Sequence, residues 1–266
     1  MELTRRHALA GAAAIAATPL LPSMPVRAAA PATDQQAPSF YRYKVGDIQV
    51  TVVSDGKNVF KLEDSFITNA KKDEVNAALE KAFLPRDIFT IYYGPLVSTP
   101  AFPNAEILVP ATEWKFWMDD GEMSRASGAR MTGLFKNNRN IFEAALKKKV
   151  TPYEWDKEVV PGLLAVETAG HTPGHTSYVL SSGSGKVFIQ SDVTNNPNPF
   201  ATNPGWHAFF DQDADMAEKT RRRVYDMAVA EKLQVQGFHY PFPCLGNVEK
   251  DGGGYRVIPA PWNPTI

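Results

Sequence analysis

The sequence predicts a layered fold of mixed α/β (α+β) class. Stretches with strand character alternate with amphipathic helical stretches, in two successive sets along the chain. Of the 266 residues, 44% are hydrophobic and 21% are charged, which is enough apolar material for a substantial core. Cys244 is the only cysteine, so packing rather than disulfide bonds must stabilise the fold. We expect one domain, or at most two.

The first half of the chain combines short strands with helices. Residues 71–83 repeat apolar side chains at three- and four-residue spacing, which is typical of one helical face. Three prolines within residues 95–103 exclude regular strand pairing there. Strands are expected at 48–56, 89–94 and 105–110, and helices over 111–120 and within 124–148.

The second half has clearer strand signals. A Gly-Ser-Gly turn at residues 183–185 joins two strands as a hairpin. The segment SSGSGK around it resembles a phosphate-binding loop only superficially, because the glycine spacing is wrong and no helix follows. Strands are expected at 163–169, 176–182, 186–192, 233–240 and 254–260, with a helix over 213–232.

Residues 1–30 have the composition of an export signal. Arg5 and Arg6 precede an alanine-rich apolar run, and small residues follow near position 28. The pair of arginines favours a twin-arginine signal, with a general secretory signal as the alternative. The apolar run is too short to span a membrane and is followed by prolines. We therefore expect a periplasmic or secreted protein, with a disordered lead-in at 31–39 and the functional domain at 40–266.

The charge balance narrows the class of partner. The chain has 28 basic and 29 acidic residues, so no basic face for nucleic acid is indicated. Once the signal is removed, no membrane association is expected. A small-molecule substrate or ligand is the expected partner, and the sequence leaves the oligomeric state open, a dimer included.

Ligand-type side chains follow three of the expected strands. The chain has five histidines, and all except His7 lie after residue 170. His171, Asp192 and His239 each stand where a strand gives way to a loop, so they could gather at one rim of a sheet. Imidazole and carboxylate groups suit Zn²⁺ or a similar ion. The alternative is that each residue is an ordinary turn or capping residue.

Three segments around these residues carry a resemblance to a known family. GHTPGHTSY at 170–178, FIQSD at 188–192 and GFHYPFPCLG at 237–246 resemble the later metal motifs of the metallo-β-lactamase superfamily, most closely its methyl parathion hydrolase and lactonase-like branch. FYRYKVGDIQVTVVSDG, AFPNAEILVPATEWKFW and GGYRVIPAP extend the resemblance over most of residues 40–266. The resemblance implies an αββα sandwich.

The resemblance also implies roles for individual residues. His171 would bind the first metal, His239 the second, and Asp192 would bridge the two. His175 would lie behind these ligands and orient them by hydrogen bonding. Five aromatic residues could line an apolar substrate pocket, although core packing explains each of them equally well: Phe200, Trp206, Phe238, Tyr240 and Phe242. His207 matches no role in the family.

One diagnostic motif of the family is absent from this sequence. The motif HxHxDH cannot be present, because no histidine lies between Ala8 and Gly170. The segment FTIYYGPLV is joined to AFPNAEIL through Ser98, Thr99 and Pro100 alone. Compared with the family, the N-terminal half would therefore be incomplete, with an apparent deletion near 97–101 that removes four metal ligands.

These observations lead to one principal hypothesis and two alternatives. The first is a zinc-dependent hydrolase of lactones, esters, phosphotriesters or β-lactams, impaired and holding at most one zinc ion through His171, Asp192 and His239. The second is a catalytically inactive scaffold that binds a ligand. The third is a deletion product of an active parent.

Overall fold

The computed structural model describes residues 40–54, 56–93, 102, 104–142, 147 and 149–266, all within the compact unit Pro38–Ile266. The predicted export signal at 1–30, the lead-in at 31–39 and the junction near 97–101 lie outside the described residues. In the described part, no helix has the length and apolar content needed to cross a membrane.

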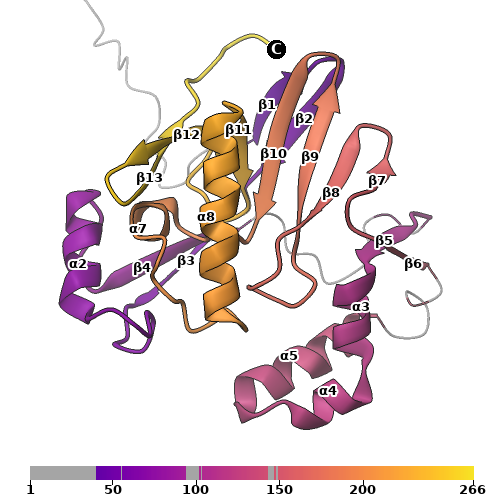
Figure 1. The fold of residues 1–266 in the computed structure, drawn as a ribbon, viewed down its shortest axis with the longest axis horizontal. Helices are drawn as coiled ribbons and strands as arrows, with labels where there is room; N and C mark the ends of the chain where they lie inside the picture. Colours follow the sequence, from indigo (N-terminus) through magenta and orange to yellow (C-terminus); the bar gives the residue numbers. More distant parts are fainter. Residues whose placement is uncertain (1–39, 55, 94–101, 103, 143–146, 148) are drawn as a thin grey trace, which may run out of the picture. The chain divides into compact units, whose positions relative to one another are not determined.

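The second half of the chain forms a seven-stranded sheet with the order β13-β12-β11-β10-β9-β8-β7 (Figure 1). All neighbouring strands are antiparallel except β10 and β11, which are parallel. The strands are β7 (Glu158–Val160), β8 (Leu163–Glu167), β9 (Thr176–Ser182), β10 (Gly185–Ser191), β11 (Gln234–Gly237), β12 (Leu245–Asp251) and β13 (Gly254–Pro259).

The six strands that precede β7 in the chain pair as three separate two-stranded sheets. Two of these pairs are antiparallel, β1 with β2 and β3 with β4, whereas β5 and β6 are parallel. Their bounds are β1 (Phe40–Val45), β2 (Ile48–Val53), β3 (Gly56–Lys61), β4 (Ile88–Tyr93), β5 (Ile107–Pro110) and β6 (Val150–Tyr153).

The longest described helix, α8 (Ala214–Ala230), has a defined start and one buried face. The Asp213 carboxylate accepts a hydrogen bond from the backbone N–H of Met216 at 2.9 Å, which satisfies one of the unpaired amides at the helix N-terminus. The other helices are α2 (Lys72–Lys81), α3 (Ala111–Met118), α4 (Asp120–Arg125), α5 (Gly128–Ile141) and α7 (Pro197–Thr202).

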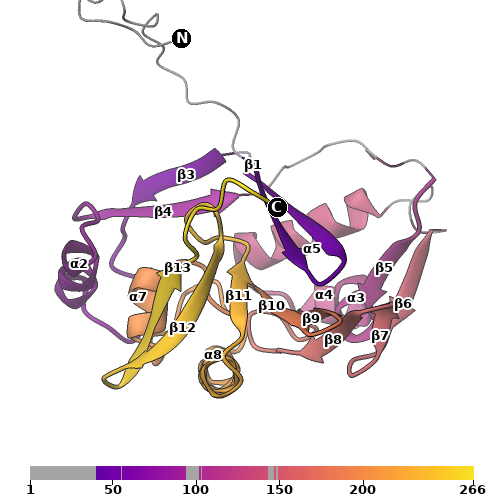
Figure 2. The ribbon, with the colours of Figure 1, turned by 90° about the horizontal axis from the view of Figure 1, so that it is seen from above.

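The large sheet is covered on both faces. On one face, Val224 and Tyr225 of α8 pack in a buried cluster with Phe188 and Val235 of the sheet. On the other face, the β1–β2 hairpin packs against β9, β10 and β12 in a second cluster that includes Val187. Val187 and Phe188, which are successive residues of β10, therefore point to opposite faces of the sheet, as the pleat of a strand requires. Figure 2 shows α8 and the hairpin on the two sides of the sheet.

A third apolar cluster joins the β3–β4 pair to neighbouring loops and helices. It contains Leu79 of α2, Phe89 of β4 and Phe200 of α7, all almost fully buried. This cluster packs β4 although its only strand partner in the described chain is β3. Burial of apolar side chains thus anchors a sheet too small to be stable by itself.

The predicted α/β class and most of its elements are confirmed. The expected helices at 71–83 and 213–232 are α2 and α8, and the hairpin turn at 183–185 joins β9 to β10. Five strands and two helices were not expected from the sequence: β1, β3, β6, β7, β12, α4 and α7. Most of these are short or strongly polar, and their stability comes from pairing and packing with distant segments.

The core of the α8 face provides a test of this arrangement. Phe188→Ala should lower the free energy of unfolding by about 3–5 kcal/mol, because Phe188 is fully buried between the sheet and α8. Chemical denaturation measures the change. Phe40→Ala is the matched control, because that ring is 57% exposed and its loss should cost about 1 kcal/mol or less. Equal losses for the two variants would contradict the assigned core.

Candidate functional site

Three strands of the large sheet end at the same edge and deliver the predicted ligand residues there. Strand β9 is antiparallel to both β8 and β10, and β11 is parallel to β10, so β8, β10 and β11 share one direction. His171 follows β8, Asp192 directly follows β10, and His239 follows β11. The topology therefore brings these residues to one sheet edge from positions 21 and more residues apart in the chain.

The backbone turns sharply where β10 ends. The ladder between β10 and β11 is irregular between Ile189 and Ser191. Ser191 has a φ of +54°, a left-handed conformation that residues other than glycine seldom adopt. Such strain is maintained only where the surroundings fix the backbone, and it occurs often at functional sites. It sets the position of the next residue, Asp192.

Asp192 and His239 face each other at this edge. His239 Nε2 lies 3.0 Å from Asp192 Oδ1. The other ring nitrogen, Nδ1, donates a hydrogen bond to the carbonyl oxygen of Tyr92 at 2.6 Å. Asp192 Oδ1 is buried, and the imidazole of His239 is the charge partner that lies within 4 Å of it among the described residues.

Charge interactions dominate the ionisation of this pair. Burial opposes ionisation of Asp192, but the contact with His239 and the nearby imidazoles of His171 and His175 lower the pKa of Asp192 to about 2. Burial also opposes the charged form of His239, yet the Asp192 carboxylate raises the pKa of this histidine above its ordinary value. Asp192 is thus an anion at neutral pH, ready to bind a proton donor or a cation.

His175 has both ring nitrogens occupied by the protein. Its Nδ1 lies 2.8 Å from the carbonyl oxygen of Thr168 and donates to it. Its Nε2 accepts a hydrogen bond from the backbone N–H of Asp192 at 2.9 Å. Burial lowers the pKa of His175, in keeping with this neutral form. His175 therefore orients Asp192 and has no nitrogen left for a metal.

His171 uses one nitrogen and leaves the other for a ligand. Its Nδ1 lies 2.9 Å from Oδ1 of Asp211, and its side chain is 21% exposed. Burial disfavours the charged ring, but Asp211 and Asp192 raise the pKa of His171 above its usual value. The ring centroids of His171 and His175 are 5.8 Å apart. The two histidines of the GHTPGHTSY segment are therefore neighbours with different hydrogen-bonding environments.

The side chains of His171, Asp192 and His239 are of the types that bind zinc, but the three do not form one metal-binding group in this structure. Nδ1 of His171 and Nδ1 of His239 each contact an oxygen of the protein, as in metal-binding histidines, and Asp192 supplies a buried carboxylate oxygen. Across the described ranges, however, no three His, Cys, Asp or Glu side chains are grouped closely enough to hold a metal ion. Asp192 and His239 form a pair, with His171 apart from it.

The sequence did not indicate Glu113 as part of this region. Its Oε2 accepts hydrogen bonds from the Thr172 hydroxyl at 2.7 Å and from the Gly174 N–H at 2.9 Å. Its Oε1 accepts a hydrogen bond from Trp117 Nε1 at 2.7 Å. A Cβ on Gly174 would lie 2.1 Å from the backbone nitrogen of Glu113, so only glycine allows α3 to approach the histidine turn. No local pattern predicts such a contact across 59 or more residues.

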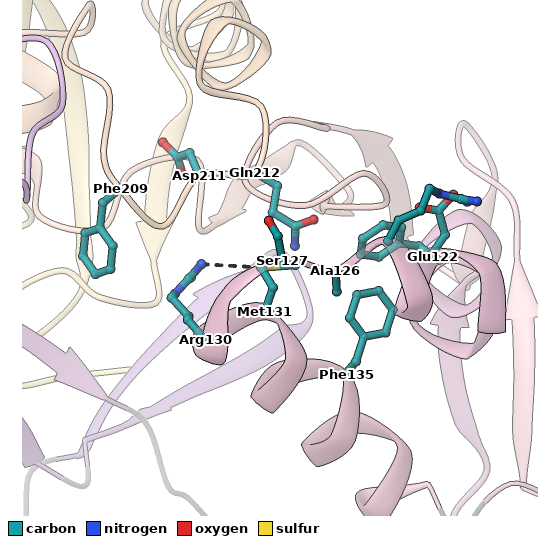
Figure 3. Close-up of a pocket in the computed structure, with 11 residues that line it drawn as sticks. Glu122, Ala126, Ser127, Arg130, Met131, Phe135, Phe209, Asp211 and Gln212 are labelled. Atoms are coloured by element: carbon teal, nitrogen blue, oxygen red, sulfur yellow. Dashed lines mark hydrogen bonds and ion pairs between the residues drawn. The ribbon is translucent and has the colours of Figure 1, made fainter.

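The five aromatic pocket candidates are dispersed. Phe200 lies in a core cluster, and the buried hydroxyl of Tyr240 is 2.6 Å from that of Tyr225. Trp206 packs at the margin of the same cluster as Phe200. Phe238 and Phe242 are 48% and 41% exposed. None of the five lines the cavity of about 360 Å³ that lies between α4, α5 and residues 209–212 (Figure 3).

That cavity borders His171 through a shared residue. Asp211, which contacts His171, also lines the cavity, together with the side chains of Arg130, Met131, Phe135 and Phe209. Figure 3 shows Asp211 and Gln212 on one side of the space and the α5 side chains on the other. The described part of the chain therefore has a hollow next to the candidate site, formed by residues that sequence patterns did not single out.

Comparisons with known proteins support the fold. No protein-family profile matches the chain. An N-acyl homoserine lactonase from Bacillus sp is 32% identical over 107 residues, which cover 40% of this chain and 38% of the lactonase. A lactonase of the same description from Bacillus cereus is 28% identical over 107 residues, again covering 38% of the relative. The matched segment thus spans well under half the length of these curated relatives.

Solved structures extend the match to most of the chain. AidC, a dizinc quorum-quenching lactonase crystallised with the product N-hexnoyl-L-homoserine, superposes with a TM-score of 0.76 at 19% identity, covering 85% of this chain and 99% of AidC. AbOPH, a hydrolase in the β-lactamase superfamily, superposes with a TM-score of 0.75 at 19% identity, covering 86% of this chain and 100% of AbOPH. The chain has the fold of metallo-β-lactamase superfamily hydrolases, and the predicted resemblance is confirmed for the fold.

The contact between α3 and the histidine turn leads to a stability prediction. Glu113→Ala should lower the free energy of unfolding by about 1–3 kcal/mol, because the Gly174 and Trp117 N–H groups lose their acceptor. Denaturant unfolding measures the loss, and amide hydrogen exchange at Gly174 should accelerate.

Glu122→Ala is the control for this change. Its carboxylate pairs with Arg125 on an exposed surface, so its removal should cost about 1 kcal/mol or less and leave exchange at Gly174 unchanged. Unaltered exchange at Gly174 in the Glu113→Ala protein would show that Glu113 does not hold the turn.

Proposed function

We propose that this protein is a metal-dependent hydrolase with a reduced site that binds a single zinc ion through Asp192, His239 and His171. The observation that carries the proposal is the buried Oδ1 of Asp192 lying 3.0 Å from Nε2 of His239, whose Nδ1 is bonded to the carbonyl oxygen of Tyr92. A carboxylate oxygen and an imidazole nitrogen are two of the ligand types that zinc binds in proteins, and here they lie side by side at the sheet edge.

The chain's own residues would have separate roles in this site. Zinc, when bound, would lower the pKa of a coordinated water and polarise the substrate carbonyl or phosphoryl group. Asp192 would supply the negative charge, held in place by the hydrogen bond from its backbone N–H to His175. Tyr92 would orient His239 through its carbonyl oxygen, and Asp211 would orient His171. His171 would approach the Asp192–His239 pair as the third ligand.

Lactones and related esters are the first substrates to test. The solved relative with the TM-score of 0.76 is a lactonase bound to N-hexnoyl-L-homoserine, and the curated relatives are N-acyl homoserine lactonases. Phosphotriesters follow as a second class, because the superfamily resemblance of the sequence includes methyl parathion hydrolase. Without the HxHxDH ligands, a site with one zinc should turn over these substrates more slowly than a dinuclear relative.

Zinc binding and hydrolysis together test this function. Metal-free protein titrated with zinc should bind one ion per chain, and His239→Ala, His171→Ala or Asp192→Asn should weaken zinc affinity by at least about 10-fold. Hydrolysis of a lactone should require zinc and fall in the same variants. His207→Ala is the matched control, because that histidine pairs with Glu218 at 3.1 Å and belongs to no part of the site.

Two outcomes would exclude the proposed hydrolase. If the protein binds no zinc, the proposed metal site does not exist. If wild-type protein hydrolyses the lactone no faster than the His171→Ala variant, the site has no catalytic role. Stabilisation of the protein by a lactone without turnover would instead support an inactive ligand-binding scaffold.

We further propose that residues 1–30 direct export through a twin-arginine pathway to the periplasm or the exterior. The support is the Arg5–Arg6 pair ahead of a short apolar run. Replacing both arginines with lysine should retain the protein in the cytoplasm, measured by cell fractionation, because this pathway reads the guanidinium pair rather than the charge alone. Unchanged export in that variant would indicate the general secretory route.

A further inference from the structure

Asp211 lies behind His171 and is one of the most buried carboxylates of the described chain. Its Oδ1 is 2.9 Å from His171 Nδ1, and only 3% of its side chain is exposed. An ionised carboxylate has no proton to donate, so it takes part in hydrogen bonds as an acceptor alone. The proton in this contact must therefore come from Nδ1 of His171.

The loop that carries Asp211 is attached to the histidine turn by its backbone. The N–H of Gln212 donates to the carbonyl oxygen of His171 at 3.2 Å, and the N–H of Asp213 donates to that of Gly170 at 3.0 Å. These bonds hold the two segments together without the Asp211 side chain. A substitution at Asp211 therefore changes the chemistry that faces His171 while the loop keeps its place.

Arg221 of α8 fixes the other oxygen of Asp211. The Arg221 side chain is 3% exposed, and one of the NH₂ groups of its guanidinium lies 3.4 Å from Asp211 Oδ2. It also donates to three carbonyl oxygens, those of Val193, Pro204 and Trp206, at 3.2, 2.8 and 3.0 Å. Because arginine is always a donor, the atom of residue 211 that faces it must be an acceptor.

Arg221 also connects the two sides of the candidate site. Val193, one of its acceptors, immediately follows Asp192, whereas Asp211 contacts His171. One buried guanidinium therefore holds both the segment after β10 and the loop that supports the turn after β8. A buried charge is tolerated only when it is paired and fully hydrogen-bonded, and here Asp211 is its ion-pair partner.

We propose that Asp211, held by Arg221, is a positioning residue that keeps the proton of His171 on Nδ1 and leaves Nε2 unprotonated. The inference deepens the proposed function, because Nε2 is the nitrogen with which His171 would bind zinc. The hydrogen bond made by one ring nitrogen determines which nitrogen carries the proton, and thus which is available as a ligand.

Asp211→Asn gives a sharp prediction because an amide has one acceptor and one donor end. Arg221 requires the amide oxygen, so the amide NH₂ group must face His171. Nδ1 must then accept, and the proton moves to Nε2. Replacement of a histidine-orienting aspartate by asparagine selects the wrong tautomer in serine proteases for the same reason.

The test is long-range ¹H–¹⁵N NMR of histidine-labelled, metal-free full-length protein, recorded above the titration of His171. His171→Ala identifies the signal. The wild-type ring should be protonated at Nδ1, and Asp211→Asn should transfer the proton to Nε2. Glu218→Gln is the matched control: it makes the same change of carboxylate to amide at the His207 pair and should leave the His171 signal unchanged.

The native spectrum keeps the proposal falsifiable even if the variant does not fold. A wild-type His171 protonated at Nε2 would overturn it, as would a folded Asp211→Asn protein with the wild-type tautomer. A zinc titration provides the link to function, with affinity expected to fall about 10–100-fold in Asp211→Asn. If wild-type protein binds no zinc, the proposed hydrolase fails, whereas the tautomer measurement still decides the role of Asp211.

Discussion

The common direction of β8, β10 and β11 is the constraint on which the candidate site depends. Strand β9 pairs antiparallel with both β8 and β10, and β11 pairs parallel with β10, so the ends of β8, β10 and β11 lie at one edge of the sheet. His171, Asp192 and His239 follow those ends, so all three lie at that edge, and Asp192 and His239 come into contact although they are 47 residues apart in the chain. The clusters on both faces of the sheet hold this alignment, because a slip of one residue would exchange the sides of Val187 and Phe188.

The polarity of the hydrogen bonds then distinguishes the histidines from one another. Both ring nitrogens of His175 make hydrogen bonds within the protein: one donates to Thr168 and the other accepts from the backbone of Asp192. In His171 and His239, Nδ1 is hydrogen-bonded to an oxygen of the protein, that of Asp211 or Tyr92. The first arrangement rigidifies the loop that carries Asp192, whereas the second is the one that prepares an imidazole to bind a cation. Two histidines four residues apart thus have different chemistry in one turn.

Buried charge connects this turn to the rest of the domain. Arg221 pairs with Asp211 and donates to the carbonyl of Val193, so α8 supports both the His171 and the Asp192 segments. Glu113 supports the same turn from α3. Each of these groups would be costly to bury alone, and each is satisfied by partners far away in sequence. The site is therefore stabilised by helices on different parts of the fold rather than by the ligand-bearing strands alone.

The sequence by itself determined the α/β class, the amphipathic helix α8 and the hairpin at 183–185. It also determined that three ligand-type residues follow strand ends. Periodicity, turn residues and short motifs are local signals, so the sequence alone reveals them. Only the tertiary structure decided that His175 accepts from Asp192, that His239 faces the Asp192 carboxylate, and that Asp211, Arg221 and Glu113 support the turn. It also placed Phe200 and Tyr240 among buried side chains. Hydrogen-bond direction and burial arise from contacts between distant segments, and local sequence patterns do not encode them.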